Sequence, residues 1–168
     1  HINNGLLEAL KMGIICDSNL FNMFLDGFAR ERLEAIIESS IINKRKIVEQ
    51  DEDDKKGIRE ILNFGHTLGH AFELNESLGL LHGEAIANGI LIVSKDSNYF
   101  SEYKSILNKL NCPIIDKVDI DQTINSLLND KKINKNGIHL IISDAIGTAK
   151  VIKTDINQIK EMLVKYGF

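Results

Sequence analysis

Three of the five histidines fall within one short segment, at positions 66, 70 and 82. His66 and His70 are four residues apart, a spacing that places two imidazoles on one face of a helix, where both can bind one metal ion. Thr67 follows the first histidine, so the segment lacks the glutamate that the zincin motif requires there. His82 precedes Gly83 at the expected start of another helix, and two packed helices would return it to the first pair.

Glycines accompany each of these histidines, at positions 65, 69 and 83. A single histidine of this kind is more often an ordinary hydrogen-bonded side chain than a ligand. Glycine within or beside a helix is unfavourable by about 1 kcal/mol relative to alanine, so three such positions favour close approach of a backbone or a ligand over chance. We therefore interpret the cluster as a site.

Charged and amide side chains at helical spacing could complete this site. Glu8 and Lys11 stand three residues apart on an otherwise apolar helix, where the simplest interpretation is a surface ion pair that stabilises little. Arg59, Asn63 and His66 would share one face of a continuous helix, and an arginine, an amide and an imidazole can bind an anion beside a metal. The alternative is an arginine on a solvated face and a capping asparagine.

Apolar periodicity predicts the elements that position these residues. Spacings of three and four are typical of helices, which we expect at 6–14, 17–25, 33–50, 58–72, 83–93, 103–110 and 120–128. Two β-rich runs, 138–142 and 149–152, predict a hairpin, and Asp155 is a suitable N-cap for a last helix. The charged cluster 51–56 is interpreted as a solvated loop. The expected fold is mainly α, with a small β-hairpin near the C-terminal end.

Composition narrows the class of protein. The 168 residues suffice for one domain with a core, and 43% of them are apolar. The net charge is −4 without a basic stripe, and no apolar run reaches the roughly 18 residues of a membrane span, so neither nucleic acid nor membrane is expected as a partner. Cys16 and Cys112 lack CxxC spacing, which favours reduced thiols in a cytoplasmic protein. The start at His1, without a methionine, indicates a piece of a longer protein.

The segment 62–73, LNFGHTLGHAFE, resembles the signature segment of the 3-dehydroquinate synthase family. Segment 81–87 is similar to the segment that follows it in that family, and the similarity extends to 4–11, 57–59, 130–132 and 146–147. The resemblance implies an enzyme in which an N-terminal α/β domain binds NAD and a multi-helical C-terminal domain holds the metal and most substrate contacts. Residues 1–168 would be the second domain, with the NAD-binding domain absent and no cofactor-binding residue of its own.

By this resemblance, Glu8, His66 and His82 match the family's ligands for Zn²⁺ or Co²⁺. One carboxylate and two imidazoles leave positions open for substrate oxygens. His70 matches the catalytic histidine that contacts the substrate phosphate. Spacing alone favours His66 and His70 as the ligand pair, whereas the resemblance replaces His70 with Glu8 and His82, and we adopt the second assignment.

The resemblance also implies catalytic or substrate-binding roles for a further set of residues: Lys11, Lys44, Arg59, Asn63 and Lys132. Two of these positions have alternatives. Lys44 is assigned to the family's active-site lysine on the assumption of one extra residue before Gly57, and without that residue the position falls on Arg45. Near the hairpin, Lys132 is preferred to Lys131 as the lysine that contacts phosphate.

The implied reaction converts 3-deoxy-D-arabino-heptulosonate 7-phosphate to 3-dehydroquinate and phosphate, in the shikimate pathway of aromatic amino acid biosynthesis. It would use transient oxidation by NAD and a metal as Lewis acid. A homodimer is expected, as is inactivity of this chain without the NAD-binding domain. Alternatives are another sugar-phosphate cyclase such as 2-deoxy-scyllo-inosose synthase, a metal-dependent alcohol dehydrogenase, and a metal-binding or assembly module without catalysis.

Overall fold

The computed structural model describes residues 2–25, 30–129 and 137–167. It is mainly helical with an antiparallel hairpin, which confirms the expected fold class. The α-helices are α1 (Ile2–Cys16), α2 (Ser18–Leu25), α3 (Leu33–Gln50), α4 (His66–Glu73), α5 (His82–Val93), α6 (Phe100–Lys109), α7 (Ile120–Asn129) and α9 (Ile156–Lys165). Short 3₁₀ helices are η1 (Arg30–Arg32), η2 (Ile58–Asn63) and η3 (Glu76–Leu78), and the strands are β1 (Ile138–Ile142) and β2 (Lys150–Thr154). Within these ranges, no helix combines the length and the hydropathy needed to cross a bilayer.

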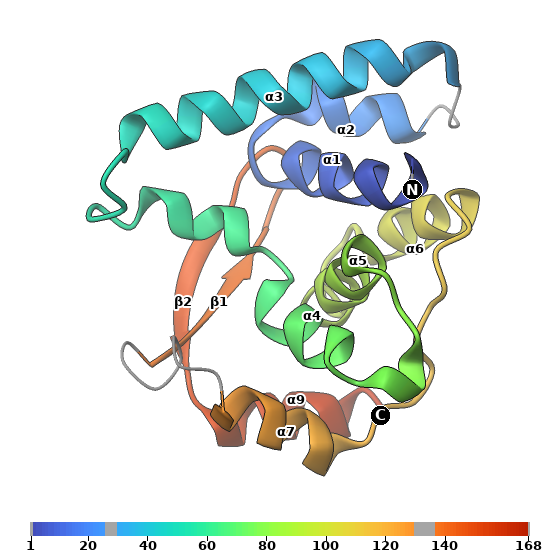
Figure 1. The fold of residues 1–168 in the computed structure, drawn as a ribbon, viewed down its shortest axis with the longest axis vertical. Helices are drawn as coiled ribbons and strands as arrows, with labels where there is room; N and C mark the ends of the chain where they lie inside the picture. Colours follow the sequence, from blue (N-terminus) through green and yellow to red (C-terminus); the bar gives the residue numbers. More distant parts are fainter. Residues whose placement is uncertain (1, 26–29, 130–136, 168) are drawn as a thin grey trace.

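The helices lie in three layers (Figure 1). α1, α2 and α3 form one layer, α4, α5 and α6 form the middle one, and α7 and α9 form the third, while the hairpin runs along one side. α1 packs on α2, α3 and α5, and α4 packs on α5 and α7. The three helices that carry the candidate metal ligands, α1, α4 and α5, therefore meet at the boundary between the first two layers.

Apolar stripes at helical spacing explain this packing. Leu6, Leu10 and Ile14 of α1 are almost fully buried, as the periodicity predicts. They belong to a core that includes residues of α2, α3, α5 and α6, whereas a second core joins α4, α7, β1 and α9. Ile159 and Leu163 of α9 complete the second core. Full burial of such a side chain stabilises the fold by roughly 1.5–3 kcal/mol.

The segment expected to be one helix from 58 to 72 is two elements, so this prediction is wrong. η2 ends, one extended residue follows, and Gly65 then adopts a left-handed backbone with φ of 77°. A β carbon at Gly65 would lie 2.6 Å from a backbone carbonyl oxygen of α5, so packing against α5 requires glycine. The turn interrupts the helical face that Arg59, Asn63 and His66 were expected to share.

The charged loop after α3 differs from the expected solvated loop at its first residue. Asp51 is only 2% exposed. Its Oδ1 accepts hydrogen bonds from the backbone N–H groups of Lys55 and Lys56, and its Oδ2 accepts one from that of Ile58. These donors, that of Lys56 above all, hold the pKa of the Asp51 carboxyl below its usual value. Asp51 thereby shapes the turn that leads into η2 and Arg59.

The hairpin and the last helix follow the prediction. β1 and β2 are antiparallel, with Leu140 opposite Ile152. Asp155 caps α9, because its Oδ1 accepts hydrogen bonds from two backbone N–H groups in the first turn, an arrangement that typically stabilises by about 1 kcal/mol. Thr67 Oγ1 on α4 donates to the carbonyl oxygen of His139 on β1 at 2.9 Å, which fixes the hairpin against the helix that begins at the candidate site.

Candidate metal and substrate site

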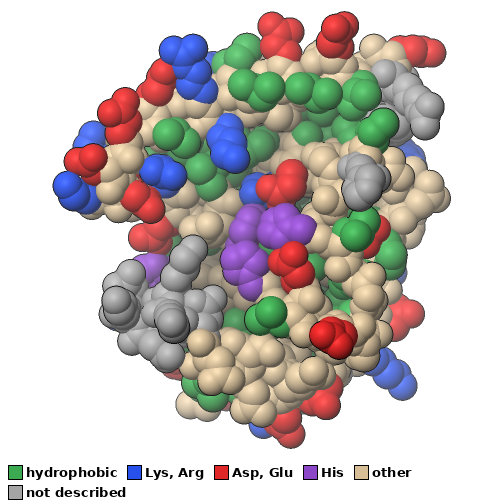
Figure 2. Space-filling model, in the orientation of Figure 1, with side chains coloured by type: hydrophobic (Ala, Val, Ile, Leu, Met, Phe, Trp, Pro, Cys, Tyr) green, Lys and Arg blue, Asp and Glu red, His purple; other side chains and the backbone are tan. Residues whose placement is uncertain are grey.

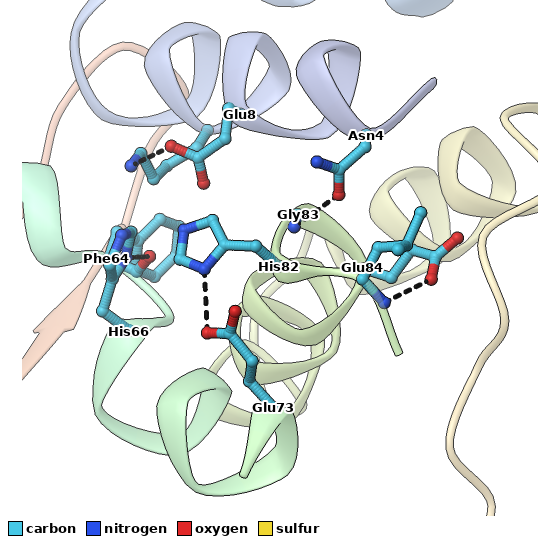
Figure 3. Close-up of polar contacts among 10 residues, drawn as sticks. Asn4, Glu8, Phe64, His66, Glu73, His82, Gly83 and Glu84 are labelled. Atoms are coloured by element: carbon cyan, nitrogen blue, oxygen red, sulfur yellow. Dashed lines mark hydrogen bonds and ion pairs between the residues drawn. The ribbon is translucent and has the colours of Figure 1, made fainter. Parts of the chain in front are cut away.

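Three side chains that are far apart in the sequence meet where α1, α4 and α5 come together. One potential ligand atom from each of Glu8, His66 and His82 lies within 4.8 Å of the others. Figure 3 shows Glu8 on α1 pointing toward the two imidazole rings, which come from the first residues of α4 and α5. A carboxylate and two imidazoles at this spacing form an incomplete coordination set suited to a divalent metal, with positions left for other oxygens.

The hydrogen bonds of the two histidines leave the same nitrogen open on each ring. His66 Nδ1 donates to the carbonyl oxygen of Phe64 at 3.1 Å, and His82 Nδ1 donates to Glu73 Oε2 at 2.9 Å. Because a carbonyl and a carboxylate can only accept, the proton belongs on Nδ1 and the lone pair on Nε2. Both rings are therefore held in the tautomer that binds a metal through Nε2.

The carboxylate of Glu8 has one oxygen engaged and one open. Its Oε2 accepts a hydrogen bond from Lys11 Nζ at 2.8 Å. Its Oε1 is buried and has no hydrogen-bond partner among the described residues. A buried acceptor without a partner is unfavourable by about 1–3 kcal/mol, and a cation held between Glu8, His66 and His82 would satisfy it. The residues present therefore fit a divalent metal.

Local electrostatics favour the protonation states that metal binding requires. Burial, and next the charge of Lys11, lower the pKa of His66 to about 4, so its imidazole is neutral at pH 7. Burial by itself raises the pKa of Glu8, but the charge and hydrogen bond of Lys11, together with the charges of His66 and His82, outweigh burial and leave the pKa below its usual value. Lys11 is 5% exposed, and burial lowers its pKa although Glu8 opposes this. The Glu8–Lys11 pair therefore differs from a surface ion pair, because Lys11 is buried and only Glu8 is partly exposed.

A cavity of about 640 Å³ opens beside the candidate ligands. Lys11 and Lys44 bring positive charge to its lining, and Asn63 brings an amide. The rest of the lining is largely apolar and comes mostly from α1 and α3. Figure 2 shows histidine side chains gathered near the middle of one face, with acidic and basic side chains beside them and hydrophobic side chains above. The cavity suits an anionic molecule whose oxygens reach the three ligand side chains.

Two of the residues expected at the site are not part of the ligand cluster. The ring of His70 lies 5.3 Å from that of His66 and 6.1 Å from that of His82, between centroids, and His70 is outside the three-residue ligand cluster. Arg59 donates from Nη1 to the carbonyl oxygen of Glu52 at 3.2 Å, and it is not among the described residues that line the cavity. His70 therefore adjoins the cluster, whereas the hydrogen bond of Arg59 is with the loop after α3.

The adjacent basic residues Lys44 and Arg45 of α3 point to different surroundings. Lys44 lines the cavity, whereas Arg45 forms an exposed ion pair with Glu49, with Nε 2.5 Å from Oε1. This arrangement favours Lys44 over Arg45 as the residue that can reach a bound molecule. Lys131 and Lys132 lie outside the described residues.

The sequence motifs do not single out Glu73, although it engages one of the candidate ligands. Glu73 is the last residue of α4 and stands three positions after His70. That helical spacing is the signal that could have indicated a carboxylate near the histidines. Asn4 is a second residue of this kind, since its side chain contacts the backbone of Gly83, next to His82.

Comparison with known proteins identifies the family. The family model described as 3-dehydroquinate synthase C-terminal matches residues 5–133. This chain belongs to that family. A 3-dehydroquinate synthase from Picrophilus torridus is 40% identical over 158 residues, which cover 88% of this chain and 47% of the relative. The 3-dehydroquinate synthase C-terminal domain described here thus spans about half the length of the curated relatives that it matches.

Solved structures share the fold of this 3-dehydroquinate synthase C-terminal domain. The 2-epi-5-epi-valiolone synthase of Streptomyces hygroscopicus subsp. jinggangensis, with NAD⁺ and Zn²⁺ bound, matches with a TM-score of 0.79 at 20% identity, over 99% of this chain and 51% of that one. A 2-deoxy-scyllo-inosose synthase complexed with carbaglucose-6-phosphate, NAD⁺ and Co²⁺ matches with a TM-score of 0.74 at 25% identity, over 98% of this chain and 51% of that one. The domain therefore has the fold of about half of each of these synthases.

Proposed function

We propose that this chain is the metal- and substrate-binding half of a 3-dehydroquinate synthase, with Glu8, His66 and His82 as ligands of Zn²⁺ or Co²⁺. The observation that carries the proposal is the buried Oε1 of Glu8, which has no hydrogen-bond partner in the described part of the chain and lies beside two histidines whose Nδ1 atoms are already engaged. Both ions accept nitrogen and oxygen ligands. Two synthases of the same fold contain Zn²⁺ or Co²⁺.

The proposed substrate is 3-deoxy-D-arabino-heptulosonate 7-phosphate, and the products are 3-dehydroquinate and phosphate. NAD, held mainly by an N-terminal half that this chain does not include, supplies transient oxidation of a ring alcohol, and the metal supplies Lewis acidity toward the substrate hydroxyls. We expect the 168-residue chain to be inactive alone, because the oxidation requires that other half.

The side chains of this chain bind and orient the substrate. Three cationic residues are assigned to its carboxylate and hydroxyls: Lys11, Lys44 and Arg59. A second set is assigned to its phosphate: Asn63, His70 and Lys132. Holding both ends of a flexible sugar acid selects the conformer in which the reacting atoms are close, which raises the rate without any new covalent chemistry. The imidazole of His70 can also carry a proton to or from the phosphate-bearing end.

The distribution of charge supports an anionic substrate. The chain carries a net charge of −4, yet the polar part of the cavity lining contains two lysines. Glu8 compensates the charge of Lys11 through their hydrogen bond, so Lys44 and a bound divalent ion would make the cavity locally positive. Such a cavity attracts a phosphorylated sugar acid although the protein as a whole is acidic.

A related sugar-phosphate cyclase is the second candidate, because the likeness to 2-deoxy-scyllo-inosose synthase extends over 98% of the chain. The substrates of the two candidate enzymes differ in whether they carry a carboxylate. The heptulosonate phosphate has one in addition to its phosphate, whereas the carbaglucose-6-phosphate bound by the cyclase has none. A lysine in the cavity beyond the one paired with Glu8 favours the substrate with two anionic groups.

Metal titration of ligand variants tests the proposal first. We expect the chain to bind one Zn²⁺, measured by competition with a chromophoric chelator. Glu8→Ala, His66→Ala and His82→Ala are each expected to lower the affinity by at least about 100-fold, the upper end of the loss caused by removing an outer-shell partner. His70→Ala is expected to retain the metal. Loss of metal in His70→Ala with retention in Glu8→Ala would instead favour the pair at four-residue spacing, and no binding by the unmodified chain would refute the metal site.

Phosphate release tests the reaction in the enzyme that contains both halves. With NAD and Zn²⁺ present, we expect release from the heptulosonate phosphate and none from glucose 6-phosphate. The opposite selectivity would support the second candidate. The substrate test is independent of the metal test, because each can succeed while the other fails.

A further inference from the structure

α1 and α5 begin side by side, and one asparagine connects them. Asn4 Oδ1 accepts a hydrogen bond from the backbone N–H of Gly83 at 2.6 Å (Figure 3). A β carbon at Gly83 would lie 2.4 Å from the backbone oxygen of Asn4 and 2.7 Å from its Oδ1. The two helices therefore approach at a distance that a larger residue at position 83 would prevent.

This contact lies next to two of the three proposed metal ligands. Asn4 is four residues before Glu8 on α1, which places both residues on one face, one helical turn apart. Gly83 directly follows His82, the first residue of α5. A shift of α1 along α5 would therefore move the carboxylate of Glu8 relative to the imidazole of His82, and the Asn4–Gly83 hydrogen bond opposes this shift.

The start of α5 needs such an acceptor. The first N–H groups of a helix have no partner within the helix. Leu81, at the N-cap position, provides no side-chain hydrogen bond to them, and the Glu84 carboxylate instead accepts from the backbone N–H of Leu81 itself. The amide oxygen of Asn4 thus caps α5 from another helix. The capping bond and the ligand geometry depend on the same contact.

We propose that Asn4 is a positioning residue for the metal site: by capping α5 at Gly83, it fixes the separation between Glu8 and His82. This proposal rests on the proposed metal-binding function. It assigns Asn4 no contact with metal or substrate. Its effect is on how well three preformed ligands fit one ion.

Asn3 provides a matched control. Its Nδ2 donates to the carbonyl oxygen of Leu110, just after α6, at 2.9 Å. Asn3 is therefore the same residue type, in the same turn of α1, and it also forms a hydrogen bond to a distant backbone group. Because that bond anchors α1 to a segment that carries no proposed ligand, Asn3→Ala should weaken the attachment of α1 without changing the Glu8–His82 separation.

The test is titration of the 168-residue chain with Co²⁺, with affinity and the visible absorption bands of the bound ion as readouts. Asn4→Ala is expected to lower the affinity by about 10–100-fold, as outer-shell substitutions do, and to change the band shape because the ligand geometry is altered. Asn4→Asp keeps the acceptor at a helix N-terminus and is expected to restore both readouts. Asn3→Ala is expected to match the unmodified chain in both. Asn4→Gln, which displaces the acceptor by one methylene, should lose affinity like Asn4→Ala and serves if the alanine variant does not fold.

Two results would overturn the role of Asn4 while leaving the metal site intact. One is an Asn4→Ala variant, folded by circular dichroism, with unchanged Co²⁺ affinity and spectrum. The other is an equal loss in Asn3→Ala, which would mean that attachment of α1 in general matters and not the contact with Gly83. His66→Ala distinguishes a failure of the metal site from a failure of the role of Asn4. If the unmodified chain does not bind Co²⁺, the metal site and the role of Asn4 both fail, whereas binding that is lost in His66→Ala but kept in Asn4→Ala refutes only the role of Asn4.

Discussion

Glu73 on α4 holds the imidazole of His82 on α5 through a hydrogen bond of 2.9 Å between Oε2 and Nδ1. Carboxylates in this position orient a metal-binding histidine and raise its basicity. We therefore expect Glu73→Ala to lower Zn²⁺ affinity by about 10–100-fold, and Glu73→Gln, which keeps an acceptor but loses the charge, to lower it less. Competition with a chelator measures both.

Glu76 is the control for this prediction, since it is an exposed acidic residue three positions after Glu73, in η3. Glu76→Ala removes a similar charge without affecting an imidazole. We expect it to bind Zn²⁺ like the unmodified chain. Equal affinities of Glu73→Ala and Glu76→Ala would show that the carboxylate does not act through His82.

Lys44 and Arg45 are adjacent on α3, but only Lys44 lines the cavity. A hydrogen bond to a charged group contributes about 1.5–3 kcal/mol, and each 1.4 kcal/mol corresponds to about tenfold in rate. In the enzyme that contains both halves, Lys44→Ala is therefore expected to lower kcat/KM for phosphate release by roughly 10–100-fold. Arg45→Ala, which removes only the exposed pair with Glu49, should leave kcat/KM unchanged. A larger loss in Arg45→Ala would reverse the assignment.

Gly89 of α5 faces the turn that starts α4. A β carbon there would lie 2.2 Å from the carbonyl oxygen of Gly65. Gly89→Ala is expected to lower the free energy of unfolding by about 1–3 kcal/mol or more and to weaken metal binding, because it separates the helices that carry His66 and His82. Chemical denaturation measures the first effect. Gly5→Ala is the contrasting variant, since no described atom lies within 4 Å of its β carbon, and it should stabilise by about 0.5–1 kcal/mol.

The buried carboxylate of Asp51 makes the stability of the loop after α3 dependent on pH. Its pKa in the fold is below the usual value of an aspartate, mainly because the backbone N–H of Lys56 donates a hydrogen bond to the charged form. A carboxyl with a lower pKa in the folded state contributes stability that is present above its unfolded-state pKa and is lost as pH falls through the folded-state value. Asp51→Asn should therefore lower the midpoint of thermal unfolding at pH 7 and reduce its fall below about pH 4. Asp53→Asn, an exposed position in the same loop, should change neither.

Local chemistry explains the parts of the fold that the sequence predicts correctly. Helix α9 begins where the capping residue Asp155 indicates, because a cap depends on neighbours within one turn. The expectation of close approach at the three glycines is also confirmed. β carbons at Gly65, Gly69 and Gly83 would lie 2.6, 2.9 and 2.4 Å from backbone atoms of packed neighbours. A glycine where it lowers helix stability indicates close packing, so the close approach can be predicted from the sequence.

The features that the sequence does not predict depend on packing between distant segments. The break before α4 follows from the contact of Gly65 with α5, and the burial of Asp51 follows from a loop that folds back on its carboxylate. The four-residue spacing predicts His66 and His70 as the ligand pair because it reflects only the geometry within one helix. The cluster with Glu8 depends on how three helices pack, and only the family resemblance implies it. The metal-binding role of that cluster stays a prediction.

The ligand cluster takes one side chain from each of three helices. An ion bound there would be a cross-link between segments that are distant in the chain, comparable in effect to a disulfide. A ligand that binds only the folded state adds to the free energy of unfolding, by about 4 kcal/mol at a concentration of one thousand times Kd. A shortage of metal would then lower the free energy of unfolding of this chain as well as its loading with the ion.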